Sequence, residues 1–151
     1  MISWQEFASE APELAKRVEA LFDNYKHHTM ATLRLDGSPR ISGTEVRIDD
    51  GQLLLGMMSG SRRAADLRRD PRLAIHSHTV DPPEQAPASW AGDAKVAGRA
   101  FELTAGSRQQ EGADWFVVDI GEVVLTTIGD PADHLVIESW KAGRGLKTQR
   151  R

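Results

Sequence analysis

The sequence predicts a mainly β protein in which six or seven mostly short antiparallel strands form a closed or nearly closed barrel. Three observations support this fold class. Apolar and polar residues alternate with period two over much of the chain after residue 28, as expected of strands with one buried face. Turns containing Gly, Asp or Pro separate these stretches. Helical spacing is confined to the N-terminus and to one short internal segment, and closing the sheet avoids long exposed edges.

Residues 1–27 are expected to form a helical cap over one end of the sheet. Ser3 and Glu6 have the spacing of a capping box, and Pro12 suits the start of a second helical segment. From Leu14 the apolar residues recur at helical spacing. They are Ala15, Val18, Leu21, Phe22 and Tyr25. We interpret this amphipathic helix as a structural cover.

The strands follow in chain order. The first alternates as far as Leu35 and ends in an Asp36-Gly37 hairpin turn. Gly98 is expected to bend or bulge its strand, and Gly121 either bulges one long strand or separates two. The other predicted strands are 39–48, 52–58, 72–79, 93–103, 115–128 and 134–140.

Two segments are predicted as connections. The proline-containing loop 80–93 holds Trp90, which either covers a site or packs the loop down. Residues 104–113 form a polar connection or a short helix.

One turn has the features of a phosphate-binding site. A strand ending at Met58 runs into small residues, and the following helix, about 61–69, opens with Arg62 and Arg63. Ser61 is a good N-cap, and the unpaired amides of a helix N-terminus favour an anion. The arginines oppose the helix dipole but add forked donors for phosphate oxygens. The alternative is a Ser-capped helix with solvated arginines.

Composition predicts one domain over residues 1–151. The chain is 40% hydrophobic and 27% charged, and its net charge of −3 does not suggest a nucleic-acid partner. The absence of cysteine excludes disulfides, thiolate metal sites and cysteine nucleophiles. No apolar run approaches the length of a membrane span, so a cytoplasmic protein with no membrane partner is expected. The basic stretch 141–151 is expected to be a flexible tail.

The histidines do not predict a metal site. His76 and His78 are expected on one face of a strand, but a third ligand is not evident. The neighbouring His27 and His28 would point to opposite faces of an extended chain. No metal is therefore predicted.

The segment Gly60-Ser61-Arg62-Arg63-Ala64-Ala65-Asp66-Leu67 resembles the phosphate-binding segment of the pyridoxamine 5'-phosphate oxidase-like flavoproteins, which reads Ser-Arg-Lys before a helix ending in Leu. The strand beginning Pro39-Arg40 is similar too, and Lys95-Val96-Ala97-Gly98 resembles the family's Arg-Val-Glu-Gly strand. The resemblance covers about residues 29–103. It implies a split β-barrel that works as a homodimer, with a flavin-type cofactor in a cleft at the subunit interface.

The resemblance also implies a set of cofactor-binding residues. The cofactor phosphate would be held at Ser61, Arg62 and Arg63. The ring system would lie against one strand and the end of another, and Lys95 completes the set. The residues implied for the ring are Arg40, Ile41, Ser42, Gly43, Met57 and Met58. Trp140 either stacks on a cofactor from the partner chain or packs in the core.

The chain departs from the family pattern at three places. Arg63 stands where the family has lysine, and Glu45 stands where the oxidase has another lysine. Residues 138–145 do not reproduce the oxidase's C-terminal substrate motif. A true pyridoxamine phosphate oxidase is therefore not expected.

The function predicted is that of an FMN-dependent oxidoreductase, in which hydride passes between a reduced nicotinamide or organic substrate and the flavin. No residue is identified as catalytic. An F420-dependent oxidoreductase is the first alternative, and a basic groove including Arg62, Arg63, Arg68 and Arg69 would suit either cofactor. A non-catalytic carrier or sensor of flavin or haem is the second, with His76 or His78 as first candidates for a haem ligand.

Overall fold

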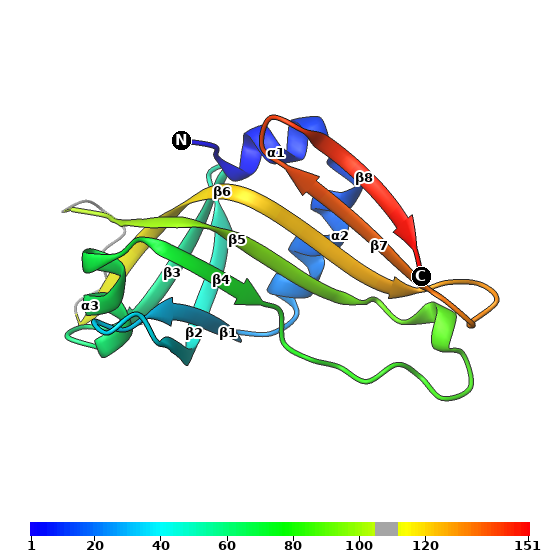
Figure 1. Ribbon diagram of the computed structural model, residues 1–151, viewed down its shortest axis with the longest axis horizontal. Helices are drawn as coiled ribbons and strands as arrows, with labels where there is room; N and C mark the ends of the chain where they lie inside the picture. The colour runs from blue at the N-terminus through cyan, green and yellow to red at the C-terminus, as the bar shows by residue number, and fades with distance from the viewer. Residues whose placement is uncertain (105–111) are drawn as a thin grey trace.

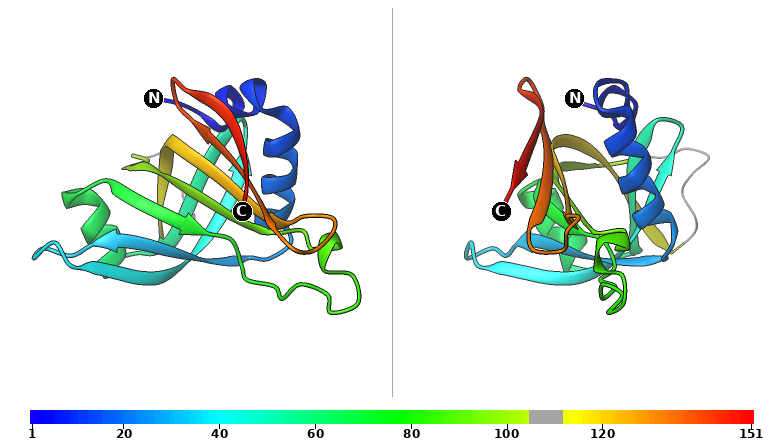
Figure 2. Two further views of the ribbon diagram at one scale, coloured as in Figure 1. Left: turned by 45° about the vertical axis from the view of Figure 1, so that its right-hand side comes forward. Right: turned by 90° about the vertical axis from the view of Figure 1, so that its right-hand side faces the viewer.

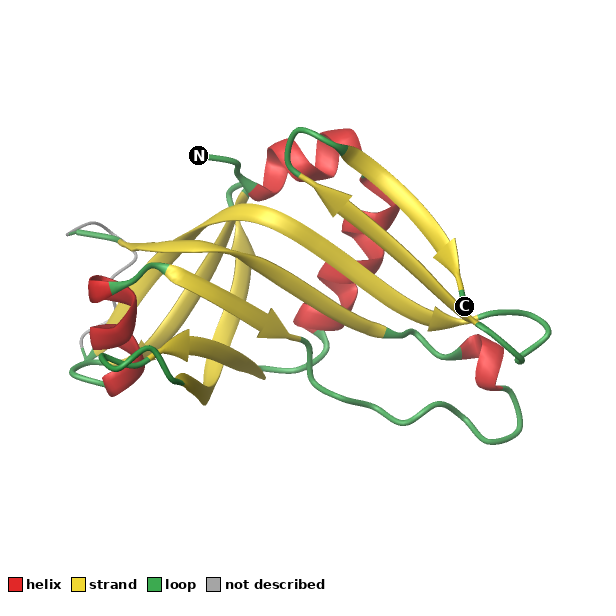
Figure 3. Ribbon diagram, viewed as in Figure 1, coloured by secondary structure: helices red, strands yellow, loops and turns green. Residues whose placement is uncertain are grey.

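The computed structural model describes residues 1–104 and 112–151, so most of the predicted connection 104–113 lies outside the described residues. The described residues form eight strands, three α-helices and one short 3-10 helix (Figures 1 and 3). In chain order these are α1 (Trp4–Glu10), α2 (Pro12–Asp23), β1 (His27–Leu33), β2 (Pro39–Asp49), β3 (Gln52–Met58), α3 (Arg62–Arg69), β4 (Arg72–His76), η1 (Pro87–Ser89), β5 (Asp93–Glu102), β6 (Ala113–Ile128), β7 (Leu135–Lys141) and β8 (Gly145–Arg150).

Six strands close into an antiparallel barrel, and two more extend it. The sheet order is β3-β2-β1-β4-β5-β6-β7-β8, and an additional pairing of β3 with β6 closes the barrel. The 16-residue β6 allows this, because its first part pairs with β3 and its last part with β7. The predicted mainly β barrel with an N-terminal and an internal helix is confirmed, with eight strands in place of six or seven.

A β-bulge bends β6 where it leaves the barrel. Ala97 pairs with Glu122 and Gly98 with Ile120, which leaves Gly121 as the extra residue on β6. A Cβ atom at Gly98 would lie 2.1 Å from the carbonyl oxygen of Asp119, so the two strands approach too closely for a side chain there. Residues 113–128 are therefore one bulged strand and not two.

The two N-terminal helices lie between the barrel and the hairpin that β7 and β8 form beyond it (Figure 2). Figure 2 shows α1 and α2 between the β7–β8 hairpin and strands β2 and β3. The predicted capping box is present, with the Glu6 amide donating to Ser3 Oγ at 3.1 Å, and Pro12 opens α2. The ring of Phe7 lies 5.0 Å from that of Trp140 on β7. No helix in the described part of the chain has the length and apolar character needed to span a bilayer.

The prediction that residues 141–151 form a flexible tail was wrong for residues 145–150. Residues 145–150 form β8, which pairs with β7 along its length. The turn into β8 uses Gly143 and Gly145 with φ of 77° and 75°, values that favour glycine. The strand was missed because its charged, mostly exposed residues lack an apolar alternation.

The loop between β4 and β5 is held by its own tryptophan. Trp90 Nε1 donates to the carbonyl oxygen of Val80 at 2.7 Å. The structure thus favours the interpretation that Trp90 packs the loop down.

A buried histidine joins the end of α2 to the end of β4. His28 is only 3% exposed, and its Nε2 lies 2.9 and 2.8 Å from the carbonyl oxygens of Phe22 and Tyr25. The amide of His78 donates to its Nδ1 at 2.9 Å, so the ring is neutral with the proton on Nε2. Burial lowers the pKa of His28, although the two carbonyls favour the protonated ring. His78 itself lies beyond β4, stacked on Tyr25 at 4.0 Å, and does not share a strand with His76.

We expect His28 to make the fold less stable in mild acid. Between its lowered folded pKa and an unfolded pKa of about 6.5, the unfolded chain binds a proton that the folded chain does not. The free energy of unfolding should therefore fall as pH drops below about 6.5, by up to about 1.4 kcal/mol per pH unit. Urea unfolding at several pH values should show a smaller slope in His28→Gln. Equal slopes in the wild-type and His28→Gln proteins would contradict the assignment.

Candidate functional site

The turn between β3 and α3 has the predicted geometry. Ser61 is the N-cap of α3, and its Oγ accepts from the Ala64 amide at 3.3 Å. Gly60 has a φ of 74°, which lets the chain reverse before the helix. Asp114 on β6 holds the turn, because its carboxylate accepts from Ser59 Oγ at 3.2 Å and from the Gly60 amide at 3.3 Å. The helix N-terminus is thereby fixed beside the end of β3.

A buried carboxylate holds α3 against the barrel. Asp66 is 2% exposed and accepts from Thr32 Oγ1 at 2.8 Å, from Arg40 Nε at 2.7 Å and from Arg69 Nη2 at 3.1 Å. Burial alone would raise the pKa of Asp66, but these hydrogen bonds outweigh it and hold the pKa below its ordinary value. The structure therefore places the Arg40 guanidinium on this carboxylate, outside both cavities described below.

Four of the predicted residues meet in one cleft. The cleft has a volume of about 410 Å³ and lies where β2, β3 and β6 meet the start of α3. Its predicted members are Gly43, Met57, Met58 and Arg63. The other lining residues are His27, Thr44, Glu45, Gly56, Gly112, Ala113 and Trp115.

Two buried N–H donors in this cleft lack an acceptor. Arg63 Nε and Trp115 Nε1 have no hydrogen-bond partner among the described residues. A buried donor left unpaired costs about 1–3 kcal/mol, so an acceptor brought by a ligand would be favoured here. Arg63 also forms no ion pair with the described residues, whereas Glu45 is 3.3 Å from Lys26. Among the described residues that line the cleft, Arg63 is therefore the guanidinium that lacks an ion pair.

Sequence reasoning missed Trp115. Its indole lies on Gly56, where an added Cβ would come within 2.7 Å of the ring, and the Arg47 guanidinium lies 4.9 Å from the ring centroid. Gly56 and Trp115 are direct partners across β3 and β6. A tryptophan that packs on a glycine of the neighbouring strand can be recognised as a site residue only when the strand register is known.

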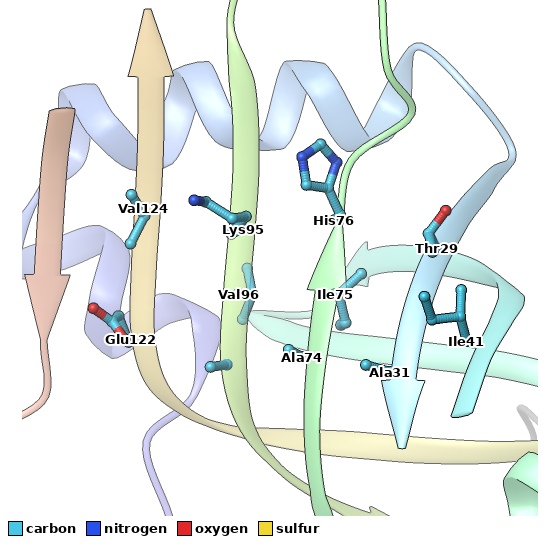
Figure 4. Close-up of a pocket in the computed structure, with 11 residues that line it drawn as sticks. Thr29, Ala31, Ile41, Ala74, Ile75, His76, Lys95, Val96, Glu122 and Val124 are labelled. Atoms are coloured by element: carbon cyan, nitrogen blue, oxygen red, sulfur yellow. The ribbon is translucent and has the colours of Figure 1, made fainter. Parts of the chain in front are cut away.

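The remaining predicted residues lie elsewhere. Ile41 and Lys95 line a second cavity of about 460 Å³ on the outer side of the sheet, which we call the trough (Figure 4). Arg62 is exposed and Ser42 half-buried, and neither lines the cleft or the trough. Trp140 is 1% exposed, and its Nε1 donates to Glu10 Oε2 at 2.8 Å. Its ring belongs to the core, so the expectation that it stacks on a cofactor is not supported.

The cleft and the trough lie along one side of β2. Ile41 faces the trough, while Gly43 and Glu45 face the cleft. Alternate residues of a strand share a face, so these three side chains point to the outer side of the barrel. A ligand on the outer side of β2 would therefore touch both cavities.

We expect the Asp66 carboxylate to be critical for stability. In Asp66→Ala, the largely buried Arg40 loses its carboxylate, and breaking such a pair costs about 3–5 kcal/mol. Urea unfolding should show this loss in the free energy of unfolding. Asp70→Ala is the matched control, because it removes a carboxylate paired with the exposed Arg72 just beyond the same helix. A loss no greater than that of the control would show that Asp66 does not hold α3.

Comparisons with solved structures show the same fold with different cofactors. A pyridoxamine 5'-phosphate oxidase-related, FMN-binding protein from Nostoc punctiforme PCC 73102 is 10% identical, with 99% of each chain covered and a TM-score of 0.62. A haem-binding protein from Mycobacterium smegmatis is 14% identical over 91% of this chain and 87% of its own, with a TM-score of 0.57. An F420 reductase is 17% identical over 70% of this chain and 94% of its own, with a TM-score of 0.51.

Sequence comparison identifies the family. No curated protein sequence matches the chain significantly. A family model described as pyridoxamine 5'-phosphate oxidase, however, matches residues 14–140, which is most of the chain. The chain therefore belongs to the pyridoxamine 5'-phosphate oxidase family.

Proposed function

We propose that this protein is an FMN-dependent oxidoreductase whose cofactor phosphate binds in the cleft beside Arg63. The observation that carries the proposal is the buried Nε of Arg63, which has no acceptor among the described residues and lies at the N-terminus of a helix. A phosphate would supply oxygens to this guanidinium and to the free amides of the first turn of α3. The Ser61 hydroxyl already caps the helix, so its expected contribution is to shape the turn.

The rest of the cleft suits a ring system. Gly43 leaves space on β2, because no heavy atom lies closer than 4.0 Å to a Cβ placed there. Met58, which is 75% exposed, adds a thioether side chain that adapts to a flat ligand, whereas Met57 is 4% exposed and belongs to the core. When bound, FMN would supply hydride transfer, and the chain would bind and orient it. A reduced nicotinamide is the proposed donor, and no side chain is proposed as a general acid or base.

A homodimer with the cofactor at the subunit interface is part of this proposal. The cleft and the trough open on the outer side of the barrel, where Ile41 is 76% exposed. A second copy lying on this side would cover Ile41 and exclude water from the cofactor. Light scattering of the purified protein tests this part, and a monomer at all concentrations would refute it.

The arginines of α3 favour FMN over F420. The basic groove expected to suit either cofactor consisted of Arg62, Arg63, Arg68 and Arg69, and an acidic F420 tail would use all of its positive charge. Arg68 instead pairs with Glu102 and Asp114, and Arg69 with Asp66. Both charges are thus largely neutralised within the chain, which leaves less positive potential for an acidic tail.

The cofactor is tested directly by the absorption spectrum of the purified protein and by mass spectrometry of the small molecule released on denaturation. Released FMN, with oxidation of a reduced nicotinamide in the presence of an electron acceptor, is the result expected. Released F420 would replace the cofactor, and a Soret band would favour haem. FMN binding without turnover would favour a flavin carrier.

We expect Arg63→Ala to weaken FMN binding by about 1.5–3 kcal/mol for each charged hydrogen bond lost, which is roughly 10- to 150-fold for one bond. Titration calorimetry with FMN and with riboflavin separates the phosphate from the ring. The loss should appear with FMN and be small with riboflavin. Arg99→Ala removes the same charge away from the cleft and serves as the control. An equal loss for both ligands would show that Arg63 does not bind phosphate.

A further inference from the structure

The strand register brings Trp115 across the floor of the cleft. Glu45 on β2 pairs directly with Gly56 on β3, and Gly56 pairs with Trp115 on β6. All three residues line the cleft. Because direct partners on neighbouring strands point to the same face of a sheet, the indole of Trp115 extends over the glycine beside it. The tryptophan is nevertheless only 3% exposed, so its polar atom is removed from water.

The indole ring is fixed by its neighbours. A Cβ atom added to Gly56 would lie 2.7, 2.8 and 2.9 Å from Cη2, Cζ2 and Cζ3 of the ring, so the benzene half of the indole lies on the glycine. Gly56 has no positive φ, so its missing side chain serves the ring and not the backbone. The Arg47 guanidinium lies 4.9 Å from the ring centroid, within the range of a cation–π contact. Leu54 and Val117 form a small buried cluster with Trp115. The position of the ring nitrogen is therefore set before a ligand binds.

The ring nitrogen of Trp115 is the atom that this packing leaves unsatisfied. Nε1 is buried and has no hydrogen-bond partner among the described residues. Two other tryptophans use the same atom within the chain. Trp90 Nε1 donates to the carbonyl oxygen of Val80, and Trp140 Nε1 donates to Glu10 Oε2. An indole nitrogen can only donate, and a buried donor without an acceptor is destabilising, so an acceptor from a ligand would be favoured at Trp115.

The other unpaired donor of the cleft is Arg63. Among the described residues three buried side-chain atoms lack a partner, and the two donors, Arg63 Nε and Trp115 Nε1, both belong to residues that line the cleft. The third, Asp93 Oδ1, is an acceptor and lies outside the cleft lining. Glu45 contributes a negative charge to the lining, but its carboxylate lies 3.3 Å from Lys26. The cleft thus offers one donor from a helix and one from a strand, which suits a group with several acceptor oxygens.

We propose that Trp115 Nε1 donates a hydrogen bond to the phosphate that Arg63 binds, so that the phosphate is held between α3 and β6. The guanidinium supplies charge, and the indole supplies a neutral donor in a fixed position. A phosphate monoester has three terminal oxygens, enough to accept from both side chains and from the first amides of α3. The inference rests on the proposed function for the identity of the ligand, because it adds a donor to the same phosphate site.

An isosteric replacement of Trp115 tests the hydrogen bond without removing the ring. In benzothienylalanine a sulfur atom takes the place of the indole N–H, so the packing on Gly56 is kept. In titration calorimetry this replacement should weaken FMN binding about tenfold and leave riboflavin binding unchanged. Without ligand its urea midpoint should not fall, because the chain loses no hydrogen bond. The same replacement of Trp90 is the matched control. It should bind FMN as the wild-type protein does, and its urea midpoint should fall because the bond to Val80 is lost.

Nuclear magnetic resonance of the unmodified protein tests the same atom. The indole N–H signal of Trp115, assigned by its absence from the replaced protein, should move when inorganic phosphate or FMN is added. The signals of Trp90 and Trp140 should stay in place, because their N–H groups are already bonded within the chain.

Three results would overturn the inference: wild-type affinity for FMN after replacement of Trp115, an equal loss of affinity for FMN and riboflavin, or a Trp115 signal that neither phosphate nor FMN moves. The two proposals fail separately. If Arg63→Ala weakens FMN binding and replacement of Trp115 does not, the role of Trp115 alone is refuted. If inorganic phosphate moves the Trp115 signal and FMN does not bind, the proposed cofactor alone is refuted.

Discussion

The carboxylate of Asp66 is the interaction on which the rest of the site depends. It accepts hydrogen bonds from Thr32 on β1, Arg40 on β2 and Arg69 on its own helix. One buried group thus fixes α3 relative to two strands of the barrel. Because Arg63 precedes Asp66 by three residues, it lies nearly one helical turn away on a neighbouring face. The orientation that places Arg63 in the cleft is therefore set by a carboxylate that faces the core.

The barrel also determines which side of β2 is available to a ligand. Arg40 and Thr44 point inward, to the Asp66 carboxylate and to the carbonyl oxygen of Gly56. Residues 41, 43 and 45 are left for the outer side. The resemblance implied that 40–43 would all touch the ring system, but alternation along a strand permits only half of them to do so on one face. The trough and the cleft meet at these outward positions because β2 borders both.

Local patterns predicted most of the fold and part of the site. The capping box at Ser3 and the N-cap at Ser61 depend on residues near in sequence, which can be read directly, whereas the choice between a bulge and a break at Gly121 required the pairing of β5 with β6. The role of Asp66 and the place of Trp115 depend on partners 26 to 59 residues away, so they required the strand register. For the same reason the sequence could not show that Arg40 pairs with Asp66 or that Trp140 donates to Glu10, because both partners lie far along the chain.

The four arginines of α3 differ in whether a carboxylate of the chain neutralises them. Arg68 makes two hydrogen bonds to Glu102 and a third to Asp114, and Arg69 binds Asp66 and the carbonyl oxygen of Leu33. These two lie at the C-terminal end of the helix, where positive charge interacts favourably with the negative end of the helix dipole. Arg62 and Arg63 lie at the opposite end, where positive charge is unfavourable and no carboxylate among the described residues neutralises it. A helix under selection for stability alone would place these charges otherwise, which makes a bound anion the simplest physical reason for them.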